Sequence, residues 1–188
     1  MIESTLSKKY PNINYLGEQI LSFNKFPLEP KISWSDVIFL EKFSNLKILK
    51  ITDCNIQSIK DFPKLKELRQ LDLSGNFISD GLFYLPSSIT RLNLARNIFE
   101  DIENLIPLRN MPRLKGLDIR GNPINIFTEK EEWANLRDEM FFMLPNLVWL
   151  DGIARINIVP SSIEEMEREL EKEFLKGIEM RKYHEGDR

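Results

Sequence analysis

The sequence has very few of the side chains that hold metals or form covalent cross-links. It contains one cysteine, Cys54, and one histidine, His184, so neither an intrachain disulfide nor a Cys/His zinc cluster can form. A single histidine also gives no basis for a Ser-His-Asp triad, and none of the eight glycines belongs to a phosphate-binding loop. We therefore predict that the chain is not an enzyme and has no cofactor.

Long apolar runs and a strong charge of one sign are absent as well. No stretch reaches the ~18 apolar residues of a transmembrane helix, and Met1–Tyr10 lacks the basic-then-apolar order of a secretory signal. The formal net charge is only −3, which argues against direct nucleic-acid binding because that needs a basic surface. With one cysteine, these features predict a reducing compartment, the nucleus or the cytoplasm or both, and no membrane partner.

What the sequence does contain is an internal repeat. The frame L-x-x-L-x-L-x-x-(N/C)-x-L recurs four times at steps of 22, 21 and 25 residues, which is the spacing of leucine-rich repeats. A truncated fifth copy follows at Leu147, Leu150 and Asp151. The residues at the main positions are Leu46, Leu49, Ile51, Cys54 and Ile56; Leu68, Leu71, Leu73, Asn76 and Ile78; Ile89, Leu92, Leu94, Asn97 and Phe99; and Leu114, Leu117, Ile119, Asn122 and Ile124.

This repeat predicts the fold. The apolar residues of L-x-L alternate as one face of a short strand requires, and parallel stacking of the strands buries leucines that no single repeat can bury alone. Asn76, Asn97 and Asn122, with Cys54 in the same slot, are expected to stabilise the buried turns through their backbone groups. We therefore predict an α/β leucine-rich-repeat solenoid with short parallel strands on the concave face, helical or 3-10 turns on the convex face, and capping helices.

The ends of such a solenoid need caps, because the terminal repeats would otherwise expose core. We predict a degenerate strand within Ile13–Asn24 and helices over Trp34–Phe43 and Glu129–Met143. A further amphipathic helix starts at a capping box near Ser161, and it folds back on the solenoid, pairs with a copy of itself or lies in a partner's groove. The predicted segments are residues 1–45 (N-terminal cap and degenerate first repeat), 46–159 (repeats and C-terminal cap) and 160–188 (amphipathic helix).

The candidate binding residues are the strand positions that flank the inward leucines, because these line the concave sheet, a common platform for partners. Asp72, Asp118 and Asp151 are expected to form an acidic line with Arg91 and Arg120 as countercharges. The tryptophan at the edge is expected to anchor a partner. For any one of these residues, plain solvation is the simpler interpretation. The predicted protein-binding residues are Lys50, Gln70, Asp72, Arg91, Asn93, Asp118, Arg120, Trp149 and Asp151.

Three segments resemble the acidic leucine-rich nuclear phosphoproteins, the 32-kilodalton group. They are SIKDFPKLKELRQLDLSGNFISDGL (58–82), LNLARNIFEDIENLIPLRNMPRLKGLDI (92–119) and MLPNLVWLDG (143–152). The Leu-Pro-x-Leu-x-x-Leu-Asp-Gly ending also occurs in other repeat proteins, among them a spliceosomal A-prime-type protein. The resemblance implies a nuclear or nucleocytoplasmic adaptor whose protein partner is a histone or chromatin complex, or subunits of the type 2A phosphatase that such proteins inhibit.

The C-terminal segment departs from this family. Its members typically carry a long Asp/Glu-rich tail, whereas residues 161–188 hold nine acidic and six basic residues. An acidic tail is what neutralises basic histone surfaces, so the histone role is less strongly implied than the adaptor role. The alternative hypothesis is a structural subunit of a larger spliceosomal or cytoskeletal assembly, docking through the helix predicted over Ser161–Tyr183.

Overall fold

The computed structural model describes residues 14–25, 39–126 and 130–155. The chain divides into two compact units after Ile153, and the elements below belong almost entirely to the first. The helix predicted over 161–183, and the first half (34–38) of the one predicted over 34–43, lie outside the described residues. The strands are β1 (Ile20–Asn24), β2 (Ile48–Thr52), β3 (Gln70–Asp72), β4 (Arg91–Asn93), β5 (Gly116–Asp118), β6 (Trp149–Leu150) and β7 (Ile153–Ala154). The helices are the 3-10 segments η1 (Leu82–Tyr84), η2 (Ile102–Asn110) and η3 (Pro123–Asn125), and α3 (Lys130–Met143).

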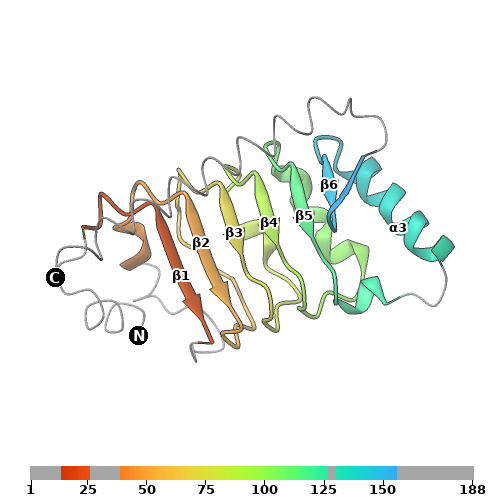
Figure 1. Ribbon diagram of the computed structural model, residues 1–188, viewed down its shortest axis with the longest axis horizontal. Coiled ribbons are helices and arrows are strands. Elements are labelled where there is room, and N and C mark those ends of the chain that lie inside the picture. Colours follow the sequence, from red (N-terminus) through yellow and green to blue (C-terminus); the bar gives the residue numbers. More distant parts are fainter. Residues whose placement is uncertain (1–13, 26–38, 127–129, 156–188) are drawn as a thin grey trace. The chain divides into compact units, whose positions relative to one another are not determined.

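The strands lie side by side in chain order, and β1 to β6 pair in parallel (Figure 1). One leucine per strand defines the register, because Leu21, Leu49, Leu71, Leu92, Leu117 and Leu150 are consecutive partners across the sheet. The 3-10 segments η1, η2 and η3 take the connections on the other side. The chain is therefore a leucine-rich-repeat solenoid with a concave face of parallel strands and a convex face of 3-10 turns, as the repeat predicts.

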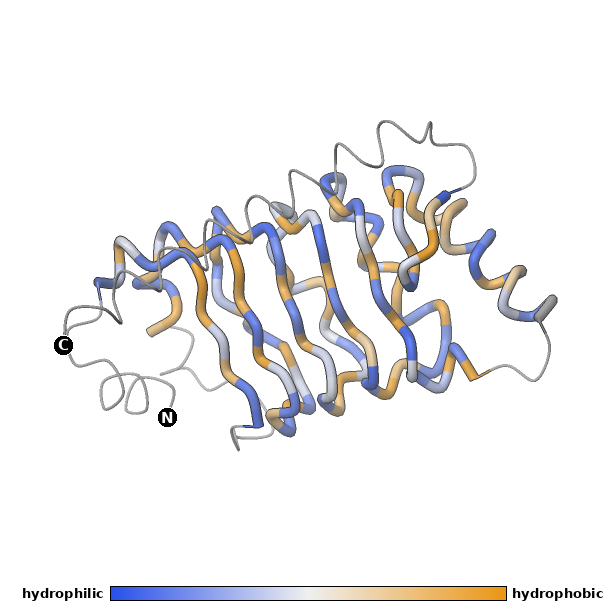
Figure 2. The backbone as a smooth tube through the Cα atoms, viewed as in Figure 1, coloured by the Kyte–Doolittle hydropathy of each residue, from blue (hydrophilic) through white to orange (hydrophobic). Residues whose placement is uncertain are grey.

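The core lies between the strands and these turns. The aligned leucines Leu49, Leu71, Leu92, Leu117 and Leu150 are at most 3% exposed, and apolar segments alternate with polar ones along each strand (Figure 2). Burial of such a side chain stabilises the fold by about 1.5–3 kcal/mol. Because each leucine packs against those of both neighbouring repeats, the core is one continuous cluster.

An asparagine ladder holds the turns that follow the strands. The Asn76 side-chain oxygen accepts from the backbone N–H groups of Cys54 and Ile56, both at 3.1 Å, in the preceding repeat. Its amide nitrogen donates to the carbonyls of Ile51 and Leu73 at 2.8 Å. Asn97 and Asn122 repeat this arrangement one and two turns later. All three asparagines are at most 4% exposed, so the predicted ladder is confirmed.

The described parts of the two caps agree with the sequence. The degenerate first strand is β1, which pairs with β2 from Ile20↔Ile48 to Asn24↔Thr52. Residues 39–41 are helical, and Phe39 and Phe43 are buried with Tyr15 packed edge-on against both rings. The helix predicted to end at Met143 is α3. The proposed segment boundaries at residues 45 and 159 stay predictions.

Candidate functional site

The pairing of the strands arranges the concave face as two rows of side chains. The first row runs Ile48, Gln70, Arg91, Gly116 and Trp149 at the start of the strands. The second row runs Lys50, Asp72, Asn93 and Asp118, two residues later. Seven of the nine predicted binding residues therefore lie in these rows. Arg120 and Asp151 come just after β5 and β6.

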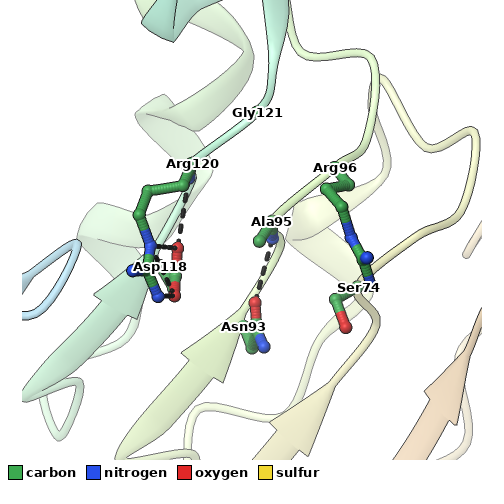
Figure 3. Close-up of a pocket in the computed structure, with 7 residues that line it drawn as sticks. All are labelled: Ser74, Asn93, Ala95, Arg96, Asp118, Arg120 and Gly121. Atoms are coloured by element: carbon green, nitrogen blue, oxygen red, sulfur yellow. Dashed lines mark hydrogen bonds and ion pairs between the residues drawn. The ribbon is translucent and has the colours of Figure 1, made fainter.

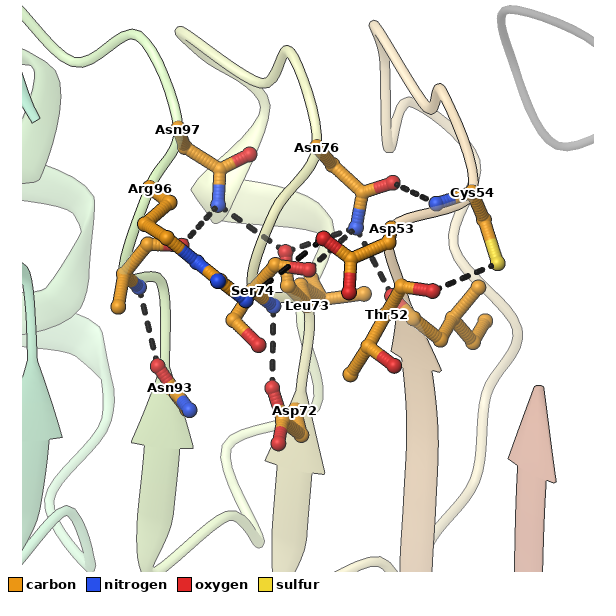
Figure 4. A network of polar contacts seen from close by, with 12 residues as sticks. Thr52, Asp53, Cys54, Asp72, Leu73, Ser74, Asn76, Asn93, Arg96 and Asn97 are labelled. Atoms are coloured by element: carbon orange, nitrogen blue, oxygen red, sulfur yellow. Dashed lines mark hydrogen bonds and ion pairs between the residues drawn. The ribbon is translucent and has the colours of Figure 1, made fainter. Parts of the chain in front are cut away.

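The second row has a structural duty that the sequence reading missed. The side-chain oxygens of Asp72, Asn93 and Asp118 each accept from the backbone N–H two residues further on, at 3.0–3.1 Å. These Asx turns end β3, β4 and β5 and start the buried turns; Figure 3 shows the bonds of Asn93 and Asp118, and Figure 4 shows that of Asp72. The signal was present in the sequence as an Asp or Asn directly after the inward leucine of β3, β4 and β5. The predicted acidic line is interrupted by Asn93, and one oxygen of each of Asp72 and Asp118 is bound to backbone.

Asp118 and Arg120 form a close ion pair. The Arg120 Nε donates to both carboxylate oxygens, at 3.0 and 3.2 Å, and Nη2 donates to Oδ2. Partial burial is the largest influence on the pKa of Asp118 and acts to raise it, but the hydrogen bonds and charge of Arg120 outweigh it and lower the pKa below its ordinary value. The same hydrogen bonds raise the pKa of Arg120. Both groups therefore remain charged, and Arg120, one of the two predicted countercharges, balances the charge of Asp118.

Asp151 faces the neighbouring turn. Its Oδ1 accepts from the backbone N–H of Ile119 at 2.7 Å, and its Oδ2 accepts from the Asn125 side chain at 2.7 Å. Burial, the largest cause, raises the pKa of Asp151, and the charge of Asp118 adds to this, while the bonds from Ile119 and Asn125 lower it. Asp151 therefore satisfies polar groups of the turn that follows β5.

A shallow hollow of about 470 Å³ opens at the end of the second row. Figure 3 shows Arg120 and Asp118 on one side of it, Arg96 on the other, and Asn93 between them. Arg96 is not among the predicted binding residues, so its place in the hollow was missed. The lining residues are Ser74, Asn93, Ala95, Arg96, Asp118, Arg120 and Gly121.

Arg96 occupies a left-handed backbone position that recurs in each repeat. Its φ is 55°, and the equivalent residues have φ values between 53° and 71°. The backbone N–H group donates to a carbonyl of the next repeat at four of these positions, Lys25, Asp53, Gly75 and Arg96. Two of the positions are glycine, the residue best suited to this conformation. The equivalent residues are Lys25, Asp53, Gly75, Arg96 and Gly121.

An ion pair crosses the middle of these positions. The Arg96 guanidinium reaches over Gly75 to the Asp53 carboxylate, 3.6 Å away (Figure 4). The Arg96 and Asp53 side chains are 65% and 38% exposed. At this distance and exposure the pair is loose, in contrast to the one between Asp118 and Arg120.

The first row carries two buried donors without acceptors. The Gln70 Nε2 and Trp149 Nε1 atoms are shielded from solvent, and neither has a hydrogen-bond partner among the described residues. Between them Arg91 is exposed, and its stem lies beside Gly116, where a Cβ would make ordinary contact at 3.5 Å from the Arg91 Cγ. Trp149 is half-buried, so it presents only part of its ring to a partner.

Within the described ranges, no three His, Cys, Asp or Glu side chains gather as a metal site would require. In the same part of the chain, no helix has the length and apolar character to cross a membrane.

Comparison with known proteins gives the same architecture. Residues 67–89 match the family model described as Leucine Rich Repeat. The crystal structure of the Drosophila melanogaster SNF/U2A' complex contains a chain with a similar fold, at a TM-score of 0.59 and 20% identity, over 91% of each chain.

Two curated relatives connect the chain to a named family. Both are called acidic leucine-rich nuclear phosphoprotein 32 family member A, from Drosophila melanogaster and from Drosophila pseudoobscura pseudoobscura. Each is 37% identical over 122 residues, which is 64% of this chain and 44% of the relative. The chain therefore spans less than half the length of these relatives. The resemblance noted from the sequence is confirmed.

Proposed function

We propose that this chain is a non-enzymatic adaptor that binds a protein partner on its concave face. The observation that carries this proposal is the contrast between the two sides of the strands. The aligned inward position is leucine in every strand from β1 to β6, whereas the outward positions include Lys50, Gln70, Arg91, Asn93 and Trp149. Outward residues that differ between repeats supply the distinct contacts that recognition of one partner requires.

The proposed partner is a histone or chromatin complex, or a subunit of the type 2A phosphatase, in the nucleus, the cytoplasm or both. Support comes from the relatives, which are named as nuclear phosphoproteins. Asp72 in the second row adds a carboxylate charge to the face, whereas the charge of Asp118 is balanced by Arg120. Such a charge favours a basic partner and speeds its association.

The test compares charge variants that preserve the Asx turns. Asn93 accepts the same backbone bond with an amide oxygen, so Asp72→Asn with Asp118→Asn removes two charges and keeps both acceptors. Binding of purified core histones, measured at two salt concentrations, should weaken in this double variant and strengthen in Asn93→Asp. Equal binding by all three proteins would exclude the acidic positions as the histone site.

The test for a phosphatase subunit uses a different variant, at a basic residue of the concave face. Arg91 is exposed at the centre of the first row, and Arg91→Glu reverses its charge. If the concave face binds a phosphatase subunit, capture of that purified subunit should fall at least tenfold. Unchanged capture of both partner classes by all variants would refute the concave-face proposal.

A second candidate function is a structural subunit of a larger assembly. The sequence observation that favours it is the apolar stripe from Ile163 to Ile178 at helical spacing. Deletion of residues 161–188 separates the two proposals. Partner binding retained after the deletion favours the concave face, and binding lost after it favours docking through the C-terminal segment.

A further inference from the structure

The hollow at the end of the second row presents donors rather than acceptors. The oxygen of Asn93 accepts from the backbone N–H of Ala95, and within the described part of the chain the amide nitrogen has no hydrogen-bond partner. Both oxygens of Asp118 are occupied by Arg120. What remains toward the hollow is the Asn93 amide, the Ser74 hydroxyl and the two guanidinium groups. Groups of this kind bind an oxyanion.

Arg96 is the cation in this hollow that a ligand can recruit. Its present partner, Asp53, lies 3.6 Å away in an exposed pair, and such pairs are weak and easily exchanged. Arg120 is instead held tightly by Asp118 and serves as the fixed wall. Asp53 therefore competes with any anion for Arg96.

The backbone conformation of Arg96 also indicates a role for its side chain. It holds a left-handed conformation, with φ 55°, at a position where Gly75 and Gly121 have φ 69° and 71°. Any residue other than glycine is disfavoured in this conformation, because its Cβ approaches a backbone carbonyl oxygen. A residue kept in an unfavourable backbone region is a reason to look for a role for its side chain.

We propose that this hollow is a binding site for an oxyanion group, a carboxylate or a phosphate monoester, carried by a peptide segment of a partner protein. Arg96 leaves Asp53 to pair with the anion, and Asn93 and Ser74 donate hydrogen bonds beside it. The proposal rests on the proposed function only in that the partner is a protein bound on the concave face.

Substitution by glycine at the left-handed positions removes a side chain without straining the backbone. Arg96→Gly removes the guanidinium and relaxes the backbone, so the domain should unfold at the same temperature or higher. Lys25→Gly is its matched control, because it removes a positive charge at the equivalent position of the first strand, three strands away. Asp53→Gly removes the competitor of Arg96. Asp61→Gly is its control, since Asp61 is exposed and has φ 61° in a different turn.

The probes are three fluorescein-labelled decapeptides, one of glutamate, one of glycine and serine with a single phosphoserine, and one of glutamine. Fluorescence anisotropy with the full chain at low salt measures their affinities. We expect the glutamate or the phosphoserine peptide to bind and the glutamine peptide not to bind. Whichever of the two binds more tightly identifies the source of the oxyanion. Arg96→Gly should weaken binding at least tenfold, and Asp53→Gly should strengthen it about threefold or more.

The controls decide the interpretation. Lys25→Gly and Asp61→Gly should bind like the wild type, so that the effects cannot be attributed to net charge alone. The proposal is overturned if neither anionic peptide binds, if folded Arg96→Gly binds like the wild type, or if Asp53→Gly binds no more tightly than Asp61→Gly. Loss of the anion site with histone or phosphatase capture intact would remove this proposal and leave the adaptor function standing. Loss of histone and phosphatase capture with anion binding intact would remove those two partners and leave the anion site standing.

Discussion

The Asp53 carboxylate and the Arg96 guanidinium meet 3.6 Å apart above Gly75, although a whole repeat separates them in the chain. They meet because each leaves the backbone at the same left-handed position of its own repeat, and the intervening repeat has no side chain there. A Cβ on Gly75 would stand 2.0 Å from the Asp53 Oδ1 and 3.4 Å from the Arg96 Nη2. The pair itself is exposed and contributes about 0–1 kcal/mol.

The first prediction concerns this glycine. Gly75→Ala introduces a side chain at φ 69° and displaces Asp53, so it should lower the free energy of unfolding by about 1–2 kcal/mol. Urea unfolding followed by circular dichroism measures the change. In an Asp53→Gly background the clash is gone, and only the backbone part of the loss should remain. The same loss in both backgrounds would contradict the role given to the ion pair.

The second prediction concerns the asparagine ladder. Asn76→Ala removes the acceptor for the N–H groups of Cys54 and Ile56 and the donor to two buried carbonyls. Unsatisfied buried groups cost about 1–3 kcal/mol each, so the fold should lose about 3 kcal/mol or more in a denaturant titration. Asn110→Ala, at an exposed residue in η2, is the control and should cost less than about 1 kcal/mol.

The third prediction separates charge from hydrogen bonding in the second row. Asp72→Asn keeps an oxygen for the Ser74 N–H, which is 3.0 Å away, and should change stability by less than about 0.5 kcal/mol. Asp72→Ala removes the acceptor and should cost about 1 kcal/mol. Thermal unfolding of both variants measures the difference. Equal stability of the two would show that the Asx turn contributes nothing.

The fourth prediction is a pH dependence of opposite sign at two neighbouring carboxyls. The pKa of Asp118 is lowered in the folded state because Arg120 outweighs burial, so its ionisation stabilises the fold above the ordinary aspartate pKa. That contribution is lost as the pH falls through the lowered folded pKa. The pKa of Asp151 is raised by burial, then by the charge of Asp118. Its ionisation therefore opposes folding, and stability is regained as the pH falls through the raised pKa toward the ordinary one.

Urea unfolding of the wild type, Asp118→Asn and Asp151→Asn between pH 7 and pH 3 tests these two signs. The advantage of the wild type over Asp118→Asn should shrink with acidification. The stability of the wild type relative to Asp151→Asn should rise as the pH falls through the upper part of the same range. Parallel curves for all three proteins would show that neither carboxyl is linked to folding.

The strands and the ladder were predictable because each depends on a pattern within the sequence. The leucines alternate at fixed intervals, so Leu92 and Leu117 identify their strands directly, and Asn97 falls in the same slot of the repeat as Asn76. The short connections of the convex face follow from apolar residues that recur at about every third position after each turn. The first strand was also recognised, although prolines surround it.

The parts of the site that sequence reading missed depend on what a side chain touches after folding. Asp151 stands in register with Asp118 and so looks like a surface acid, but its oxygens turn to the Ile119 N–H and to Asn125. Arg96 looks like a turn residue, and its reach over Gly75 is visible only once three repeats are stacked. The oxygens of Asp72 and Asp118 were assigned to a partner, whereas the nearest backbone N–H satisfies one oxygen of each.

The asparagine ladder also gives the solenoid a direction. The side-chain oxygen of Asn76 accepts from the Cys54 N–H, that of Asn97 accepts from the Ile78 N–H, and that of Asn122 accepts from the Phe99 N–H. In each case the bond comes from the repeat that follows. A ribosome synthesises the chain from the N-terminus, so each emerging repeat keeps open N–H groups until the next asparagine has left the exit tunnel. Nascent chains stopped just before and just after Asn97 should therefore differ sharply in their resistance to protease.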